Sequence, residues 1–92
     1  MIVQIAELKL HKLLNNLGYT LVTTHHRDMT EEDQDFYKFQ GVVIEGRYTT
    51  KDGKKKAVSF TLGNNTDEKV LDVTLRDLEG AIVRYDKEED MD

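Results

Sequence analysis

The sequence predicts an α+β fold, in which an N-terminal helix is followed by about five antiparallel strands. Three observations support this prediction: an apolar stripe with helical spacing in the first 17 residues, a β-hairpin pattern between Phe36 and Leu62, and shorter apolar runs on both sides of the hairpin. A sheet of this size either stays open with a helix on one face or curls into a barrel. We therefore expect a bent sheet or a small barrel.

The helix is predicted over residues 1–17, because apolar side chains recur there at about 3.6 residues per turn. The members of this stripe are Val3, Ala6, Leu10, Leu13, Leu14 and Leu17. Gly18 follows directly, and a glycine at this position commonly ends a helix in the left-handed conformation. Residues 19–26 are rich in β-branched and aromatic side chains, which predicts the first strand.

The hairpin can be predicted down to its register. Its two apolar arms share one face only if the numbers of paired residues have an even sum, because side chains alternate along a strand. A three-residue loop satisfies this condition, since it pairs Thr50 with Lys54. The third position of such a loop needs a positive φ, and Gly53 occupies it. Ile44 is then predicted to lie opposite Phe60.

Two irregular features are predicted, one before the hairpin and one in its first arm. Residues 28–35 carry five acidic side chains and are predicted as a charged loop. The alternative is a short helix capped by Thr30, with Asp33 in its first turn. Phe39 does not share the alternation of the strand that follows, which predicts a β-bulge at Gly41.

After the hairpin, residues 70–75 and 81–86 are predicted as the last two strands, joined by one turn. Helical spacing also runs through this stretch, but Gly80 disfavours a helix interior by about 1 kcal/mol. Residues 87–92 are predicted as an acidic disordered tail, so that the single domain spans residues 1–86. At the level of architecture alone, the predicted fold resembles small SH3-like barrels.

The composition limits the compartment and the chemistry. The chain has 92 residues, enough for one domain, and no cysteine, which excludes disulfides and fits a reducing compartment. No apolar run approaches the roughly 18 residues of a membrane span. The N-terminal stretch carries charges throughout and lacks the cleavage site of a signal peptide. We therefore expect a cytoplasmic protein that does not contact membranes.

Charge is unevenly distributed along the chain. The net charge is −5, yet the hairpin segment 36–62 contains six basic and two acidic residues. Segments 28–35 and 86–92 each contain five acidic residues. An acidic protein is a poor general ligand for nucleic acid, since phosphate affinity comes from cations, but the basic hairpin keeps a local site open.

No pattern predicts catalysis, a cofactor or a metal site. His25 and His26 are adjacent and point to opposite faces of a strand, so they cannot readily share a metal ion. No residue spacing matches a known metal-binding loop. Ser59 is the only serine, and it lies in mid-strand without an adjacent base. We therefore expect a protein that is not an enzyme.

The leading hypothesis is a non-enzymatic protein-interaction module, an adaptor or an inhibitor whose acidic segments contact a protein partner. The expected contact residues are Asp28, Glu31, Glu32, Asp33, Asp35, Glu88, Glu89 and Asp90. An exposed strand edge would offer a second mode of contact, either with a partner or with another copy of the chain.

The alternative hypothesis is a nucleic-acid-binding small β-barrel that uses the basic hairpin 47–56. Its cations would contact phosphates, and its aromatic ring would stack on a base. The residues concerned are Arg47, Tyr48, Lys51, Lys54, Lys55 and Lys56. The same lysines would equally serve to keep a hairpin edge soluble.

Overall fold

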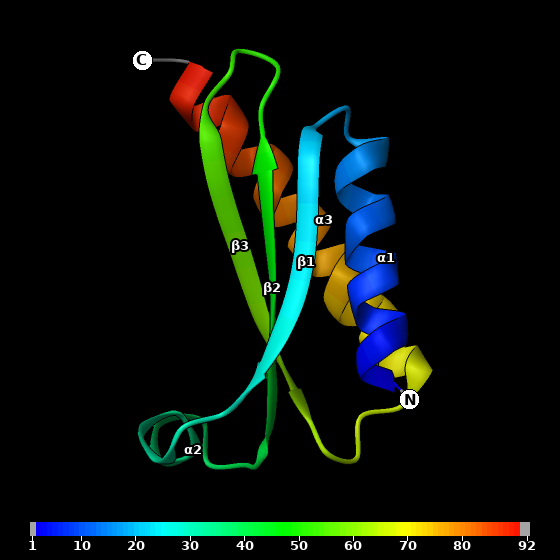
Figure 1. Ribbon diagram of the computed structural model, residues 1–92, viewed down its shortest axis with the longest axis vertical. Coiled ribbons are helices and arrows are strands. Elements are labelled where there is room, and N and C mark those ends of the chain that lie inside the picture. Colours follow the sequence, from blue (N-terminus) through cyan, green and yellow to red (C-terminus); the bar gives the residue numbers. More distant parts are fainter. Residues whose placement is uncertain (1, 91–92) are drawn as a thin grey trace.

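The computed structural model describes the backbone of residues 2–90 and the side chains of residues 2–85. The elements in chain order are α1 (Ile2–Asn16), β1 (Thr20–Asp28), α2 (Glu31–Tyr37), β2 (Gly41–Thr49), β3 (Lys55–Gly63) and α3 (Glu68–Asp90). The three strands form one antiparallel sheet in the order β1–β2–β3. Helices α1 and α3 lie on the same face of this sheet, and α2 lies beyond its end (Figure 1).

The hydrophobic core lies between the inner face of the sheet and the two long helices. Its buried members are Ala6, Leu10, Leu14, Ile44, Tyr48, Leu62, Leu71, Leu75 and Ile82. The predicted N-terminal helix is confirmed, with its stripe turned toward this core. Gly18 ends it with a φ of +89°, as the sequence predicts. The ammonium of Lys9 also joins α1 to α3, because it lies 2.6 Å from the carboxylate of Asp72.

The predicted register of the hairpin is confirmed. Ile44 pairs with Phe60, and the regular pairing continues along the whole of β2 and β3. Thr50 N–H donates to the carbonyl of Lys54 at 2.8 Å and closes the three-residue loop. Gly53 has a φ of +85°, the conformation that the loop requires.

The two strands predicted over residues 70–75 and 81–86 are wrong, because the chain forms the single helix α3 there. The buried residues Leu71, Leu75 and Ile82 recur at helical spacing and pack on the core. Gly80 does not interrupt the helix, and a side chain at that position would meet nothing within 4 Å. The core contact of the stripe therefore outweighs the low helix propensity of one exposed glycine.

The end of α3 also differs from the prediction. The helical backbone continues to Asp90, whereas residues 87–92 were expected to be disordered. Glu and Lys are good helix formers, and they extend a helix that the core has already nucleated. Residues 91 and 92 and the side chains of residues 86–92 lie outside the described part of the structure.

The charged loop predicted over residues 28–35 is also wrong, since helix α2 begins within it. The Thr30 hydroxyl accepts a hydrogen bond from Asp33 N–H, and the Asp33 carboxylate accepts one from Thr30 N–H, both at 3.1 Å. This reciprocal capping box satisfies two donors that would otherwise be exposed at the helix start. Lys38, with a φ of +65°, ends the helix.

The predicted β-bulge at Gly41 is wrong as well. Gly41 pairs regularly with Gly63, and a Cβ there would collide with the carbonyl oxygen of Leu62. Phe39 precedes the strand, so it does not have to share the alternation of β2. The irregularity lies in β1 instead, where the register shifts between Thr20 and Thr23 around the exposed Leu21.

The predicted α+β class is confirmed, but the sheet of the described residues has three strands instead of about five. Strands β1 and β3 do not pair with each other, so the sheet does not close into an SH3-like barrel. Within the described residues, no helix combines the length and the apolar character needed to cross a bilayer.

Candidate functional site

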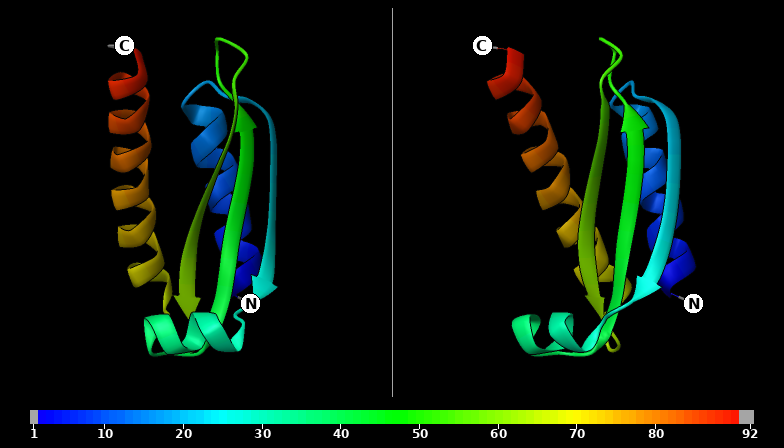
Figure 2. Two further views of the ribbon diagram at one scale, coloured as in Figure 1. Left: turned by 90° about the vertical axis from the view of Figure 1, so that its left-hand side faces the viewer. Right: turned by 60° about the vertical axis from the view of Figure 1, so that its left-hand side comes forward.

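A groove lies between α3 and the tip of the β2–β3 hairpin. Helix α3 diverges from the sheet toward its C-terminal end, which separates it from the start of β3 (Figure 2). The groove has a volume of about 710 Å³. Its lining residues are Tyr48, Lys54, Lys55, Lys56, Ala57, Val58, Leu78, Ala81, Ile82 and Tyr85.

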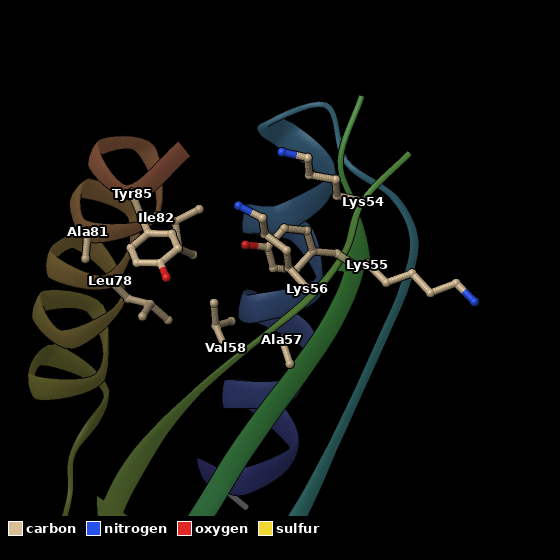
Figure 3. Close-up of a pocket in the computed structure, with 10 residues that line it drawn as sticks. Lys54, Lys55, Lys56, Ala57, Val58, Leu78, Ala81, Ile82 and Tyr85 are labelled. Atoms are coloured by element: carbon tan, nitrogen blue, oxygen red, sulfur yellow. The ribbon is translucent and has the colours of Figure 1, made fainter. Parts of the chain in front are cut away.

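The walls of the groove are apolar. Leu78, Ile82 and Tyr85 point toward it from α3, and Val58 faces them from β3 (Figure 3). Ile82 also belongs to the buried core, so this wall is anchored to the rest of the fold. Tyr85 is 61% exposed, which leaves a large amphipathic side chain at the open end.

Three lysines form the rim on the hairpin side. Lys56 points toward α3, and its ammonium lies 5.2 Å from the centre of the Tyr85 ring (Figure 3). Lys54 lies 3.7 Å from the carboxylate of Asp52, whereas Lys55 points away from α3. The pKa of Asp52 is lowered chiefly by a hydrogen bond from the Thr50 hydroxyl, and also by the charges of Lys54 and Lys56. Three lysines beside one ionised carboxylate leave the rim with an excess of positive charge.

The six residues proposed for nucleic-acid binding do not form one surface. Arg47 lies on the face of the sheet opposite the helices and is exposed there. The end of the Lys51 side chain lies beside Gly18, at the turn that follows α1. Tyr48 is only 5% exposed, and its ring stacks on that of Tyr19 with 4.5 Å between ring centres. Tyr48, Lys54, Lys55 and Lys56 line the groove, and Arg47 lines a smaller neighbouring hollow with Tyr48, Lys55 and Lys56.

The predicted acidic contact residues lie at opposite ends of the molecule. Asp28 ends β1, and Glu31, Glu32 and Asp35 are exposed on or near α2. The backbone of residues 88–90 lies at the far end of α3, and the side chains there are outside the described part (Figure 1). The acidic residues therefore do not form one patch.

A network of charges occupies the outer face of the sheet. Arg27 lies 2.9 Å from Asp33 and 3.4 Å from Glu45, and His25 lies 2.7 Å from the other oxygen of Glu45. The hydrogen bond from Arg27 lowers the pKa of Asp33, and the hydrogen bond with His25 lowers that of Glu45. These contacts join α2 to the sheet, which indicates a structural role.

The adjacent histidines point to opposite faces, as expected. His25 contacts Glu45 on the outer face, and His26 contacts Glu7 of α1 on the inner one. Among the described residues, no cluster of three or more histidine, aspartate or glutamate side chains could hold a metal ion.

The α3 side of the groove does not follow from the predicted elements. A turn at residues 76–79 and a strand at residues 81–86 do not bring Leu78, Ala81 and Ile82 together as one wall, whereas a helix does. A signal was present, because Leu75, Leu78, Ile82 and Tyr85 recur at helical spacing.

No protein-family model, no curated protein and no solved structure matches this chain. The groove therefore has to be interpreted from its own shape, composition and charge. An apolar cleft with a few polar groups at its rim is the usual form of a binding site.

Proposed function

We propose that this protein is a non-enzymatic protein-interaction module, an adaptor or an inhibitor, whose groove binds an acidic segment of a partner protein. The observation that carries the proposal is the composition of the groove: apolar walls from α3 and β3 open onto a rim of three lysines. The protein as a whole is acidic, with a net charge of −5. A cationic rim in an acidic protein selects for a ligand of negative charge.

The apolar walls and the lysine rim of such a site contribute to binding in different ways. Burying one large apolar side chain of the partner contributes roughly 1.5–3 kcal/mol. Lys54 is exposed and Lys56 is half-buried at the edge of the groove, so their charges add association rate and specificity more than affinity. The favoured ligand is therefore a segment that combines apolar and acidic side chains.

The lining of the groove supports binding rather than catalysis. Its described residues contribute hydroxyl and ammonium groups but no histidine, carboxylate or serine side chain. General acid–base catalysis near neutral pH most often uses histidine or a carboxylate. A surface of this composition can hold a ligand without transforming it.

The main rival is single-stranded nucleic acid bound through the hairpin. Such ligands need aromatic rings on which bases stack, along a continuous cationic track. The burial of Tyr48 against Tyr19 and the position of Lys51 beside Gly18 weigh against it. The remaining cations lie on both faces of the hairpin, with Lys56 toward α3 and Arg47 and Lys55 on the outer face, so they do not form one continuous track.

Selection from a random library of 12-residue peptides tests the proposal. We expect enrichment of peptides that carry both acidic and apolar residues. Changing Lys54, Lys55 and Lys56 together to Glu should abolish their binding. The matched control changes Lys12, Lys69 and Arg76 to Glu, which are exposed outside the groove and lower the net charge equally. Binding to this control should persist.

Three results would overturn the proposal: no enrichment, enrichment of basic peptides, or equal loss of binding in both triple variants. The rival would be favoured if a 20-nucleotide single-stranded DNA bound tightly to the unmodified protein. This binding would have to be lost in the variant with Glu at Lys54, Lys55 and Lys56 and kept in the control variant. As a second groove variant, Ala81→Trp fills the cleft from an exposed position. It should also weaken binding of the selected peptides.

A further inference from the structure

Strand β3 forms one edge of the sheet. The order β1–β2–β3 pairs β3 with β2 on one side, and no strand among the described residues pairs with the other side. An exposed edge of this kind presents backbone donors and acceptors to any extended chain that approaches it.

The hydrogen bonds at the two ends of the hairpin show which residues of β3 face outward. Thr50 N–H donates to Lys54 O, and at the other end Asn64 N–H donates to Gln40 O. Because hydrogen-bonded pairs alternate in an antiparallel ladder, the even-numbered residues of β3 bond to β2. The odd-numbered residues therefore direct their N–H and C=O groups to the outer edge. These residues are Lys55, Ala57, Ser59 and Thr61.

This edge has little of the protection that edge strands normally carry. Its lysines are confined to one end, at Lys55 and Lys56, and the chain contains no proline. The pairing of β3 with β2 is regular throughout, so no bulge twists the edge away. Ala57 and Ser59 in its central part are exposed. The edge is therefore open to pairing.

The edge and the groove are continuous. Val58 lies on β3 and faces α3 across the groove, whereas Lys55 points to the opposite side (Figure 3). A fourth strand beside β3 would place every second side chain on the α3 side, next to Leu78 and Tyr85. Its other side chains would lie on the outer face, beside Lys55.

We infer that the partner segment binds as an added strand along the outer edge of β3, with alternating apolar and acidic side chains. The inference rests on the proposed function, since it specifies how the groove holds its ligand. Apolar side chains would enter the groove, and acidic ones would lie on the outer face, beside Lys55. Backbone hydrogen bonds to Ala57, Ser59 and Thr61 would supply affinity that does not depend on the partner's sequence.

Charge favours an acidic segment over a second copy of this chain. The segment from Lys54 to Gly63 contains three lysines and no acidic residue. Two copies of β3 would bring two positive segments together, whereas an acidic strand neutralises the one that is present.

The test uses an acetylated and amidated nine-residue peptide in which Glu and Val alternate. Its control is a scrambled peptide of the same composition.

Ser59→Pro removes one outward N–H without removing a bond to β2, and proline is tolerated in edge strands. Ser59→Thr keeps the N–H and serves as the matched variant. We expect Ser59→Pro to weaken binding of the alternating peptide about tenfold. Ser59→Thr should bind it as the unmodified protein does.

Methylation of backbone nitrogens in the peptide gives a second measurement that does not depend on how Ser59→Pro folds. In an added strand, only alternate N–H groups of the peptide face β3. We therefore expect one set of alternate N-methyl groups to weaken binding about tenfold more than the other set.

Equal binding of the alternating and scrambled peptides, or equal effects of the two N-methylated sets, would overturn strand addition. The same holds if selected library peptides bind but the alternating peptide does not. In these cases the proposed groove function stands, since the library selection tests it separately. If sedimentation shows a dimer that Ser59→Pro converts to a monomer, the occupant of the edge is a second copy, and the inference fails.

Discussion

The effect of a substitution on the stability of this fold depends on the atoms around the substituted residue. Two glycines show this. A Cβ on Gly46 of β2 would lie 2.9 Å from a methyl of Leu10 and 3.2 Å from one of Leu14. Both leucines are completely buried, so they have little room to move. A Cβ on Gly80 of α3 would meet nothing within 4 Å.

The same substitution should therefore have opposite effects at these two glycines. Gly46→Ala should destabilise the protein by about 1–3 kcal/mol through overpacking. Gly80→Ala should stabilise it by about 0.5–1 kcal/mol, because alanine loses less conformational freedom in a helix. Urea unfolding of the two variants measures both effects. A Gly46→Ala variant as stable as the unmodified protein would show that α1 does not approach β2 as closely as described.

Arg27 stabilises the carboxylates on the outer face of the sheet. It lowers the pKa of Asp33 through a hydrogen bond, and it contributes with His25 to lowering that of Glu45. A carboxyl group whose pKa is lower in the folded state stabilises the fold above its unfolded pKa. That contribution disappears as the pH falls through the folded pKa.

The stability of the protein should therefore decrease below about pH 5, where Asp33 and Glu45 begin to bind protons in the unfolded chain. Arg27→Met should reduce this decrease, since it removes a cause of both lowered pKa values. Arg76→Met removes the same charge from an exposed position on α3 and is the control. Urea unfolding at several pH values between about 3 and 7 measures the dependence. Identical pH profiles for the two variants would contradict this account.

At the scale of elements, α3 shows how packing overrides local preference. Leu71 and Val73 would share a face in a strand, but a helix separates them by about 200°. The structure buries Leu71 completely and leaves Val73 56% exposed. The two side chains therefore distinguish the observed helix from the strand that the sequence predicted.

Leu71→Ala should destabilise the protein by about 2–5 kcal/mol, because it leaves a cavity in the core. Val73→Ala should change stability by less than about 0.5 kcal/mol, as is usual for surface positions. Thermal or urea unfolding of the two variants provides the comparison. Similar losses at both positions would favour a strand in this region.

The elements also differ in how well the sequence predicts them. The register of the hairpin followed from the parity of Ile44 and Phe60 and from the conformation of Gly53, and the structure agrees. The capping residue Thr30 was recognised, but the helix it begins was assigned to a loop. The helix also contacts another element, because Arg27 of β1 lies 2.9 Å from Asp33.

At the scale of the whole molecule, the local charge of the groove opposes the net charge. An acidic peptide is repelled by a protein of net charge −5 but attracted by the lysine rim. Screening at physiological salt extends over about 8 Å, so the charges nearest the ligand dominate. The lysines of the rim should therefore determine how fast an acidic peptide associates with the protein.

The association rate of a library-selected acidic peptide should accordingly fall as the salt concentration rises from about 50 to 200 mM. When Lys54, Lys55 and Lys56 are changed to Gln, the local attraction is removed and the rate should no longer fall with salt. A control variant with Gln at Lys12, Lys69 and Arg76 should keep the original dependence. Stopped-flow fluorescence measures these rates. A rate that rises with salt in the unmodified protein would mean that net repulsion prevails.

The sequence by itself determined the features that depend on neighbouring residues: the N-terminal helix, the hairpin register and its glycine loop. Each follows from periodicity or turn chemistry within a short segment. Only the tertiary structure decided that residues 68–90 form a helix, because their apolar stripe is stabilised by distant residues of α1 and β2. It also decided the groove, whose walls come from β3 and α3, segments separated by about 20 residues in the chain. A site shared by two such segments exists only once the core has set the position of both.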